Sequence, residues 1–433
     1  MSVDRSLLPA PGVAGEQMHA LMRELFPLNR SLTGDGVRTT LARLGVALPV
    51  TPIETPTGTS VFDWTAPNEW NVREAWIESP TGERIVDFAS SNLHVLGYSA
   101  AVDATVSRAE LAEHVFTHPS DPDLVPYRTS YYKEQWGFCM AQRVLESLPD
   151  GPYRVRIDAS LEPGSVTYGE CVLPGSTSEE FLLTTYVCHP SLANDNLSGV
   201  VLLSALGQAL ASQALRYTYR LLWSPGTIGP LCWLRNNRNT IDRVRHGLVL
   251  SCLGDPGGMT YKCSRRGKTE IDVAVAHVLR ASGEKHTLLN WFPWGGDERQ
   301  FCSPGFDLAM GALSRTPADH FPEYHSSADN PDFVKPEMLE ASLNTCLDII
   351  EVIEGNARYR NRCPYGEPQL GKRGLYRSVG GGSSQETALL WVLSLSDGTS
   401  TLLEISERSA LPFGAIREAA DRLLEHDLLE VVM

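Results

Sequence analysis

A histidine and an aspartate six residues apart are the strongest candidates for chemistry in this chain. His189 ends the apolar run Phe181–Cys188, and Asp195 opens a Ser/Gly-rich turn toward a predicted helix. Strand ends of an open α/β sheet are where such folds present groups to a ligand. An imidazole nitrogen and a carboxylate are both zinc ligands. The spacing therefore predicts part of a metal site, although Asp195 could also serve as a helix N-cap.

Three further strings place polar side chains after predicted strands. Asp255 follows the apolar run Leu248–Cys252, and His325 lies in the string Glu-Tyr-His-Ser-Ser-Ala-Asp that ends at Asp329. The segment Ser224–Gly229 follows the strand that ends at Trp223. A lone histidine is more often structural, but several candidate ligands at strand ends favour a site. Asp255 could instead cap a turn before a proline.

These strings, in this order, resemble the di-zinc aminopeptidase superfamily, which also includes glutaminyl cyclases. They are most similar to its poorly characterised branch that has an inserted β domain and a C-terminal winged-helix domain. The shared strings are His-Pro, Asp-Asn-x-Ser-Gly, Pro-x-Thr-Ile-Gly, Gly-Asp, Gly-x-Asp-Glu-Arg-Gln and Tyr-His-x-Ser-Ala-Asp. Each string alone is weak, but six in order, over essentially the whole chain, form a specific signal.

The resemblance implies a set of metal ligands: His189 and Asp255 on one zinc, His325 on the second, and Asp195 bridging both. Two such ions polarise a scissile carbonyl and activate a water molecule. A neighbouring glutamate then passes the proton to the leaving amine. The chain departs from this pattern at position 191, which is a serine, and at Gly226, where related chains carry the glutamate of Pro-Glu-Thr-Ile-Gly.

The loss of that glutamate leaves three accounts open. Glu298 can stand in as base or ligand, and with its neighbour Asp297 it forms the candidate catalytic pair. Asp297 and Asp329 can equally be turn residues or carboxylates that orient a ligating histidine. Alternatively, a single ion, zinc or else Fe(II) or Mn(II), supports non-hydrolytic chemistry. In the third account the protein is a degenerate relative that binds without turnover.

Substrate contacts are predicted at Arg265, Arg266 and Tyr324. The two arginines follow an apolar strand and could bind a carboxylate in bidentate fashion, or could be ordinary surface charge. Glu298 could pair with Arg299 or Arg265. The favoured function is metal-dependent hydrolysis of an amide or peptide bond in a small amino-acid-derived substrate, in a biosynthetic pathway. A peptide or small molecule is the expected partner.

Strand-like and helical runs alternate from about residue 150, which predicts an α/β fold. The resemblance specifies it as the aminopeptidase-like, phosphorylase/hydrolase-type mixed sheet flanked by helices. We expect residues 1–50 and 126–360 to form the metal-binding core, with a β-rich insert at 51–125. Residues 361–384 are expected to be a linker, and residues 385–433 a winged-helix domain.

Charge and composition exclude several partners. The net charge is −15, and the tail from residue 385 holds nine acids against three arginines, whereas a duplex binder needs a basic face. We therefore expect no nucleic acid partner and a packing or homo-oligomer role for the tail. No apolar run approaches the ~20 residues of a membrane span. The N-terminal residues do not resemble a secretory signal, and nine scattered cysteines suit a reducing compartment. The expected location is the cytoplasm.

Overall fold

The computed structural model describes residues 4–7, 9–375 and 384–432. The chain divides into two compact units. Among the described residues, the larger unit comprises Asp4–Asp272 and Lys285–Asn344, and the smaller comprises Val273–Glu284 and the residues from Thr345 onward. Helices α7 (Glu270–Ala281) and α9 (Pro336–Gly355) have residues in both units. The two units are described separately below.

The larger unit is built on a mixed eight-stranded sheet, in the order β1-β10-β12-β11-β13-β16-β14-β15. The pairs β11/β12, β11/β13, β13/β16 and β14/β15 are parallel, whereas β1/β10, β10/β12 and β14/β16 are antiparallel. The strands are β1 (Thr51–Pro56), β10 (Ser165–Leu173), β11 (Glu180–Tyr186), β12 (Thr218–Ser224), β13 (Val244–Leu250), β14 (Met259–Lys262), β15 (His286–Leu289) and β16 (Met310–Ser314). The predicted mixed α/β fold is confirmed.

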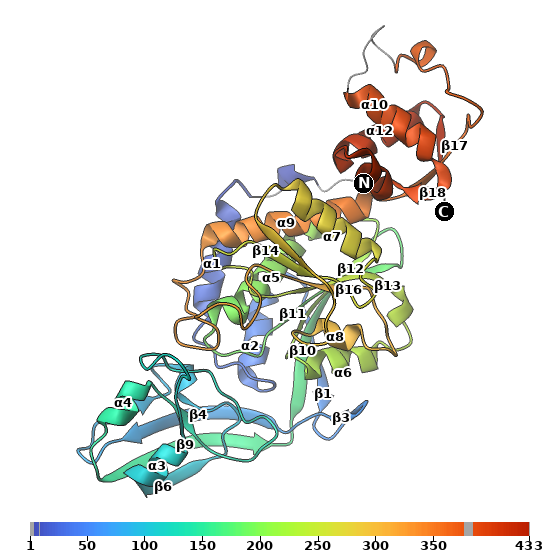
Figure 1. Ribbon diagram of the computed structural model, residues 1–433. Helices are drawn as coiled ribbons and strands as arrows, with labels where there is room; N and C mark the ends of the chain where they lie inside the picture. Colours follow the sequence, from blue (N-terminus) through green and yellow to red (C-terminus); the bar gives the residue numbers. More distant parts are fainter. Residues whose placement is uncertain (1–3, 8, 376–383, 433) are drawn as a thin grey trace. The chain divides into compact units, whose positions relative to one another are not determined.

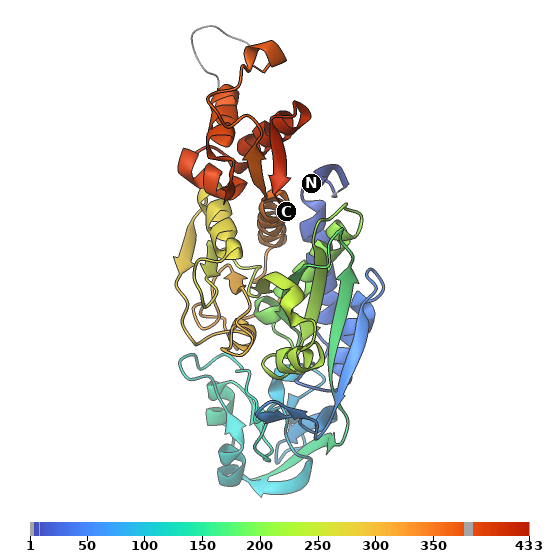
Figure 2. The same cartoon turned by 90° about the vertical axis from the view of Figure 1, so that its right-hand side faces the viewer.

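The central strands of the sheet have continuous apolar sequences because they are buried on both faces. All seven residues of β11 are buried, as expected for a strand covered on both faces. Helix α5 (Ser198–Ala211) follows β11 and packs on β10, β11 and β12. The sheet is flanked by helices (Figures 1 and 2), among them α1 (Val13–Leu25), α2 (Asp35–Leu44), α6 (Ile228–Asn236) and α8 (Glu298–Phe301).

The insert contains a separate antiparallel sheet in the order β5-β4-β9-β6. Its boundaries differ from the expected 51–125. Strand β1 pairs with β10 in the core, whereas β9 pairs with β4 and β6 in the insert. The insert sheet therefore extends to Glu162, because one chain segment runs from its last strand into β10. Its elements are β2 (Ser60–Val61), β3 (Trp64–Thr65), β4 (Glu69–Glu78), β5 (Arg84–Asp87), β6 (Val102–Ser107), α3 (Arg108–Glu113), β7 (Val115–Phe116), β8 (Phe138–Cys139), α4 (Gln142–Ser147) and β9 (Pro152–Glu162).

Besides its parts of α7 and α9, the described portion of the smaller unit contains three α-helices of its own and a three-stranded antiparallel sheet, β18-β17-β19. The elements are β17 (Arg358–Asn361), α10 (Ser384–Leu395), β18 (Asp397–Thr401), α11 (Leu402–Ser409), α12 (Phe413–Glu425) and β19 (Leu429–Val432). A capping box between Thr401 and Glu404 fixes the start of α11. Strand β17 places the beginning of this unit before the expected linker, and residues 376–383 of that linker lie outside the described residues.

Two further expectations concern membranes and thiols. Among the described residues, no helix is both long enough and apolar enough to cross a bilayer. All nine cysteines lie within the described ranges, and all of them are free.

Candidate metal centre

His189 lies in the loop after β11 and is held from its backbone. Its carbonyl oxygen accepts a hydrogen bond from Nε of Arg30 at 3.0 Å, and the Arg30 side chain is buried. Two residues on, the Ser191 hydroxyl donates to the carbonyl of Phe26 at 3.1 Å. The loop is therefore fixed against the N-terminal segment, which leaves the imidazole free to face the other candidate ligands.

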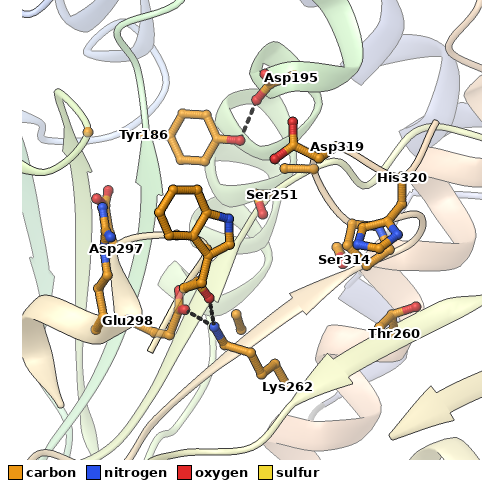
Figure 3. A pocket seen from close by; sticks show the side chains of 18 of the residues that line it. Tyr186, Asp195, Ser251, Thr260, Lys262, Asp297, Glu298, Ser314, Asp319 and His320 are labelled. Carbon is orange, nitrogen blue, oxygen red and sulfur yellow. Dashed lines mark hydrogen bonds and ion pairs between the residues drawn. The ribbon is translucent and has the colours of Figure 1, made fainter. Parts of the chain in front are cut away.

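Asp195 lies in the kinked segment Ala193–Leu197 directly before α5, where the backbones of Asp195 and Asn196 are not helical. The amides of Asn194 and Asp195 donate to the two carboxylate oxygens of Asp329 at 2.6 and 2.9 Å. Burial of that carboxyl raises the pKa of Asp329 to about 8. On the side chain of Asp195, Oδ1 accepts a hydrogen bond from the Tyr186 hydroxyl (Figure 3). Asp329 thus fixes the turn, and Tyr186 orients the carboxylate.

His325 has a left-handed backbone conformation, with φ of 53°. Its carbonyl oxygen accepts the amide of Tyr127 at 2.7 Å, which ties this loop to the insert. The imidazole stacks on the ring of Tyr324, with centroids 3.9 Å apart and an angle of 12° between the planes. Tyr127 contacts it edge-on at 5.0 Å between centroids. Aromatic neighbours therefore fix the direction of the ring.

These three side chains converge on one point. The ligand atoms of His189, Asp195 and His325 all lie within 4.8 Å of one another. Oδ2 of Asp195 is 3.0 Å from Nε2 of His325 and 3.9 Å from Nε2 of His189. Within the described part of the chain, neither Oδ2 of Asp195 nor Nε2 of His325 has a hydrogen-bond partner of good geometry, although both atoms are buried. Orphaned buried acceptors are costly unless something binds them.

The protonation states also suit a metal. Burial lowers the pKa of His189 to about 4, so the ring is neutral near pH 7 and retains its lone pair. Burial alone would raise the pKa of Asp195, but His189, His325 and the Tyr186 hydroxyl outweigh it and lower the pKa to about 2. A neutral His189 imidazole, a second imidazole and a carboxylate match catalytic zinc sites with an open position, and also 2-His-1-carboxylate Fe(II) sites. The residues present therefore fit a single ion.

Asp255 is not brought into this cluster. Its Oδ1 accepts from the Thr316 hydroxyl at 2.5 Å and from the Gly257 amide at 2.8 Å. Its Oδ2 accepts from the Thr316 amide and from the Asn194 side chain, both at 3.1 Å. Because four donors occupy its oxygens, Asp255 acts here as a tie between two loops and Asn194. Asp255 is therefore not retained as a candidate metal ligand, although the resemblance implied that it binds zinc together with His189.

Asp297 lies next to the position of the missing glutamate. A Cβ placed on Gly226 would be 4.0 Å from Oδ1 of Asp297, and that oxygen accepts the amide of Thr227 at 2.7 Å. Its Oδ2 is buried and has no hydrogen-bond partner among the described residues. Burial, reinforced by the charge of Glu298, raises the pKa of Asp297 to about 7 although the Thr227 amide opposes it. A carboxyl group near Gly226 is therefore poised to exchange a proton at neutral pH.

Glu298, the expected substitute base, has a different environment. Its side chain is fully buried and pairs with Nζ of Lys262 at 2.5 Å (Figure 3). Lys262 also donates to the carbonyls of Trp294 at 2.6 Å and Phe292 at 3.3 Å. Because the ammonium group of Lys262 occupies the Glu298 carboxylate, the arrangement favours Asp297 over Glu298 as the base. The ion-pair partner of Glu298 is therefore Lys262, and not Arg299 or Arg265 as expected.

The predicted substrate contacts fall into two groups. Tyr324 lines the cavity beside the histidines. Arg265 and Arg266 do not line that cavity. Both arginines pair with Asp307 instead, and the distances from their Nε atoms to its carboxylate are 3.4 and 2.8 Å. Satisfied in this way, the two arginines act as surface charge.

A cavity of about 520 Å³ is lined by two of the candidate ligands, His189 and Asp195, and by Asp297. It is lined by residues from several loops and strand ends, and Figure 3 shows Tyr186, Asp195, Asp297, Glu298 and Lys262 around it. Sequence reasoning missed Lys262 and Tyr186. For Lys262, the sequence did contain a signal: a lysine at the end of the short strand β14 is expected to be buried, and a buried lysine requires a partner. For the tyrosine at the end of β11, no sequence signal separates a ligand-orienting hydroxyl from an ordinary core ring.

Comparison with known proteins assigns the class. A Bacillus subtilis zinc aminopeptidase has the same fold at 11% identity, with a TM-score of 0.57 over 78% of this chain and 94% of that one. The present protein thus has an aminopeptidase-like α/β fold, with a β insert and a winged-helix domain. Residues 357–431 match a winged helix-turn-helix family.

The family follows from closer relatives. Residues 19–356 match the family described as a domain of unknown function, DUF4910, and the chain belongs to it. A Clostridium acetobutylicum protein, named provisionally as a polysaccharide biosynthesis protein with an aminopeptidase-like domain, is 45% identical over 421 residues, 96% of this chain and 97% of its own. A crystal structure from the same organism, named provisionally as a peptidase, is 44% identical with a TM-score of 0.93 over 97% of both chains.

Proposed function

We propose that this protein is a metal-dependent hydrolase that cleaves the amide bond of a small substrate bound in the 520 Å³ cavity. The observation that carries the proposal is the convergence of His189, Asp195 and His325. Two of these ligands line the same cavity as the carboxyl group of Asp297, whose pKa is near neutrality. The aminopeptidase-like fold supports the same class of reaction. The name of the Clostridium relative favours a biosynthetic role.

The metal site is assigned to three residues of this chain. His189, Asp195 and His325 would hold one zinc ion, which when bound supplies Lewis acidity toward a carbonyl and lowers the pKa of water. Tyr186 and Arg30 keep two of these ligands in place through the contacts described above. Tyr186 donates a hydrogen bond to the Asp195 carboxylate, and Arg30 donates one to the backbone carbonyl of His189.

Asp297 is assigned the proton transfers. At pH above about 7 its carboxylate accepts a proton from the attacking water, and the resulting acid returns that proton to the leaving amine. This is the task that a glutamate at position 226 performs in the related pattern. The neighbouring Gly226 leaves the space that the Asp297 carboxyl approaches.

The donor set also favours a second candidate, a single-ion enzyme of non-hydrolytic chemistry. Two imidazoles and one carboxylate are the ligands that Fe(II) oxygenases use. Metal identity separates the two candidates, because the hydrolase requires activity with zinc and the alternative requires iron.

The test uses the full chain with zinc and a panel of aminoacyl and N-acyl amides, followed by mass spectrometry of the released amine. We expect turnover that a chelator abolishes and added zinc restores. Asp297→Asn should lower the rate by about 10²–10⁴-fold, whereas Asp63→Asn, at an exposed aspartate, should leave it unchanged. Equal rates for the Asp297→Asn variant and the parent would rule out this role for Asp297.

A further inference from the structure

An exposed aromatic loop lines the same cavity. Residues 291–296, between β15 and α8, carry Phe292 and Trp294, whose exposed fractions are 42% and 70%. Both line the cavity that contains His189 and Asp195. A large ring left in water forgoes the burial that normally stabilises it. An aromatic ring exposed at the wall of a binding cavity is therefore available to stack on a ligand.

The loop is held in place by the buried ion pair. Nζ of Lys262 donates to the carbonyls of Trp294 and Phe292, pairs with Glu298, and lies 4.2 Å from the centroid of the Phe292 ring. Gly295 has a φ of 119°, and a Cβ there would approach Nζ of Lys262 to 3.0 Å. The chain thus wraps closely around the ammonium group. Such anchoring keeps the exposed rings in a defined position, as a preformed binding surface requires.

The rest of the cavity wall is rich in hydrogen-bonding groups. Thr260, Ser314, Asp319 and His320 line it, and Figure 3 shows Thr260, Ser314 and His320 on the same side of the pocket. Thr260 and Ser314 are buried, so a purely apolar ligand, such as an aromatic amino-acid side chain, would leave their hydroxyls without partners, which is costly. A sugar ring offers both features at once, because its C–H face is apolar while its hydroxyls point outward from the rim.

We propose that the substrate is an N-acylated amino sugar whose ring stacks on Trp294, with its hydroxyls bonded to the polar wall. This proposal rests on the proposed function, since it names the substrate class of that site. In the hydrolysis, the oxygen of water bonds to the acyl carbon and the C–N bond breaks. The amine nitrogen receives a proton, and the products are a carboxylate and the free amino sugar.

The test measures binding separately from turnover. N-acetylglucosamine is titrated into the full chain in the Asp297→Asn background, with binding followed by calorimetry. We expect saturable binding that weakens roughly tenfold when Trp294→Ala is added. The matched control is Trp64→Ala, at another exposed tryptophan, 40% exposed, that does not line this cavity; it should leave the affinity unchanged.

Three results would overturn the proposal: absence of binding, equal weakening by both tryptophan variants, or tighter binding of N-acetylphenylalanine amide than of the sugar. Failure of the proposed function is distinguishable. If the sugar binds in a Trp294-dependent way but the zinc-loaded parent protein hydrolyses no N-acyl amino sugar, the recognition stands and the hydrolase assignment fails.

Discussion

Replacing Asp297 with asparagine should stabilise the protein while sharply lowering its proposed activity. The carboxyl is 5% exposed, and burial raises its pKa from an ordinary value of 3.8 to about 7. Between these two values the unfolded chain has released the proton while the folded chain retains it. Stability attributable to this group therefore falls as the pH rises through that interval. Asparagine has the same shape, can still accept the Thr227 amide, and carries no such cost.

The magnitude follows from the size of the shift. About three pH units at 1.36 kcal/mol each gives a gain of about 4 kcal/mol for Asp297→Asn at pH 8, and about 2 kcal/mol at pH 5.5. Below pH 4 the variant and the parent should be equal. A gain in stability that accompanies loss of activity is the pattern expected where an active site holds a destabilising charge.

Chemical denaturation of the metal-free full chain at pH 4, 5.5 and 8 measures this difference. Asp63→Asn, at an exposed aspartate, is the control and should show no pH-dependent change relative to the parent. An Asp297→Asn variant no more stable than the parent at pH 8 would contradict the reasoning. So would a difference that does not grow between pH 4 and pH 7, because Asp297 would then ionise without penalty.

Three further outcomes follow from the same contacts. Lys262→Met should lower the free energy of unfolding by about 3–5 kcal/mol, since it leaves Glu298 buried and unpaired; the double variant Lys262→Met/Glu298→Leu should recover most of that loss in the same denaturation assay. Gly226→Ala should change the melting temperature by less than about 4 °C, because the new Cβ would meet Sγ of Cys188 at an ordinary 3.4 Å. In gel-shift assays at low salt the full chain should not retain duplex DNA, because its C-terminal region from residue 385 is acidic; salt-sensitive binding would refute that expectation.

The sequence was sufficient to predict the mixed α/β fold and the winged-helix domain, because both depend on local patterns. Apolar runs such as Phe181–Cys188 mark buried strands, and the order of elements after residue 384 marks the tail. The boundary of the insert was not predictable in the same way. Whether β1 and β9 join the core sheet or the insert sheet depends on pairing between strands far apart in the chain.

The candidate site likewise has a part that the sequence could predict and a part that depends on contacts between distant segments. His189 and Asp195 are close in sequence, so their proximity could be expected, and resemblance placed His325 with them. The environment of Asp255 could not be predicted from the sequence, because its oxygens accept hydrogen bonds from Thr316 and Asn194, which lie on separate loops. The approach of Asp297 to Gly226 likewise joins residues more than seventy positions apart, and no pattern within either segment records it.

Metal content is the most direct test of the central claim that His189, Asp195 and His325 form the metal centre. The full chain and its variants would be loaded with zinc, dialysed and assayed by elemental analysis. We predict one tightly held ion per parent chain, none in His189→Ala or His325→Ala, and an unchanged ion in His320→Ala, a matched histidine of the same cavity outside the cluster. An ion retained in both ligand variants would contradict the account.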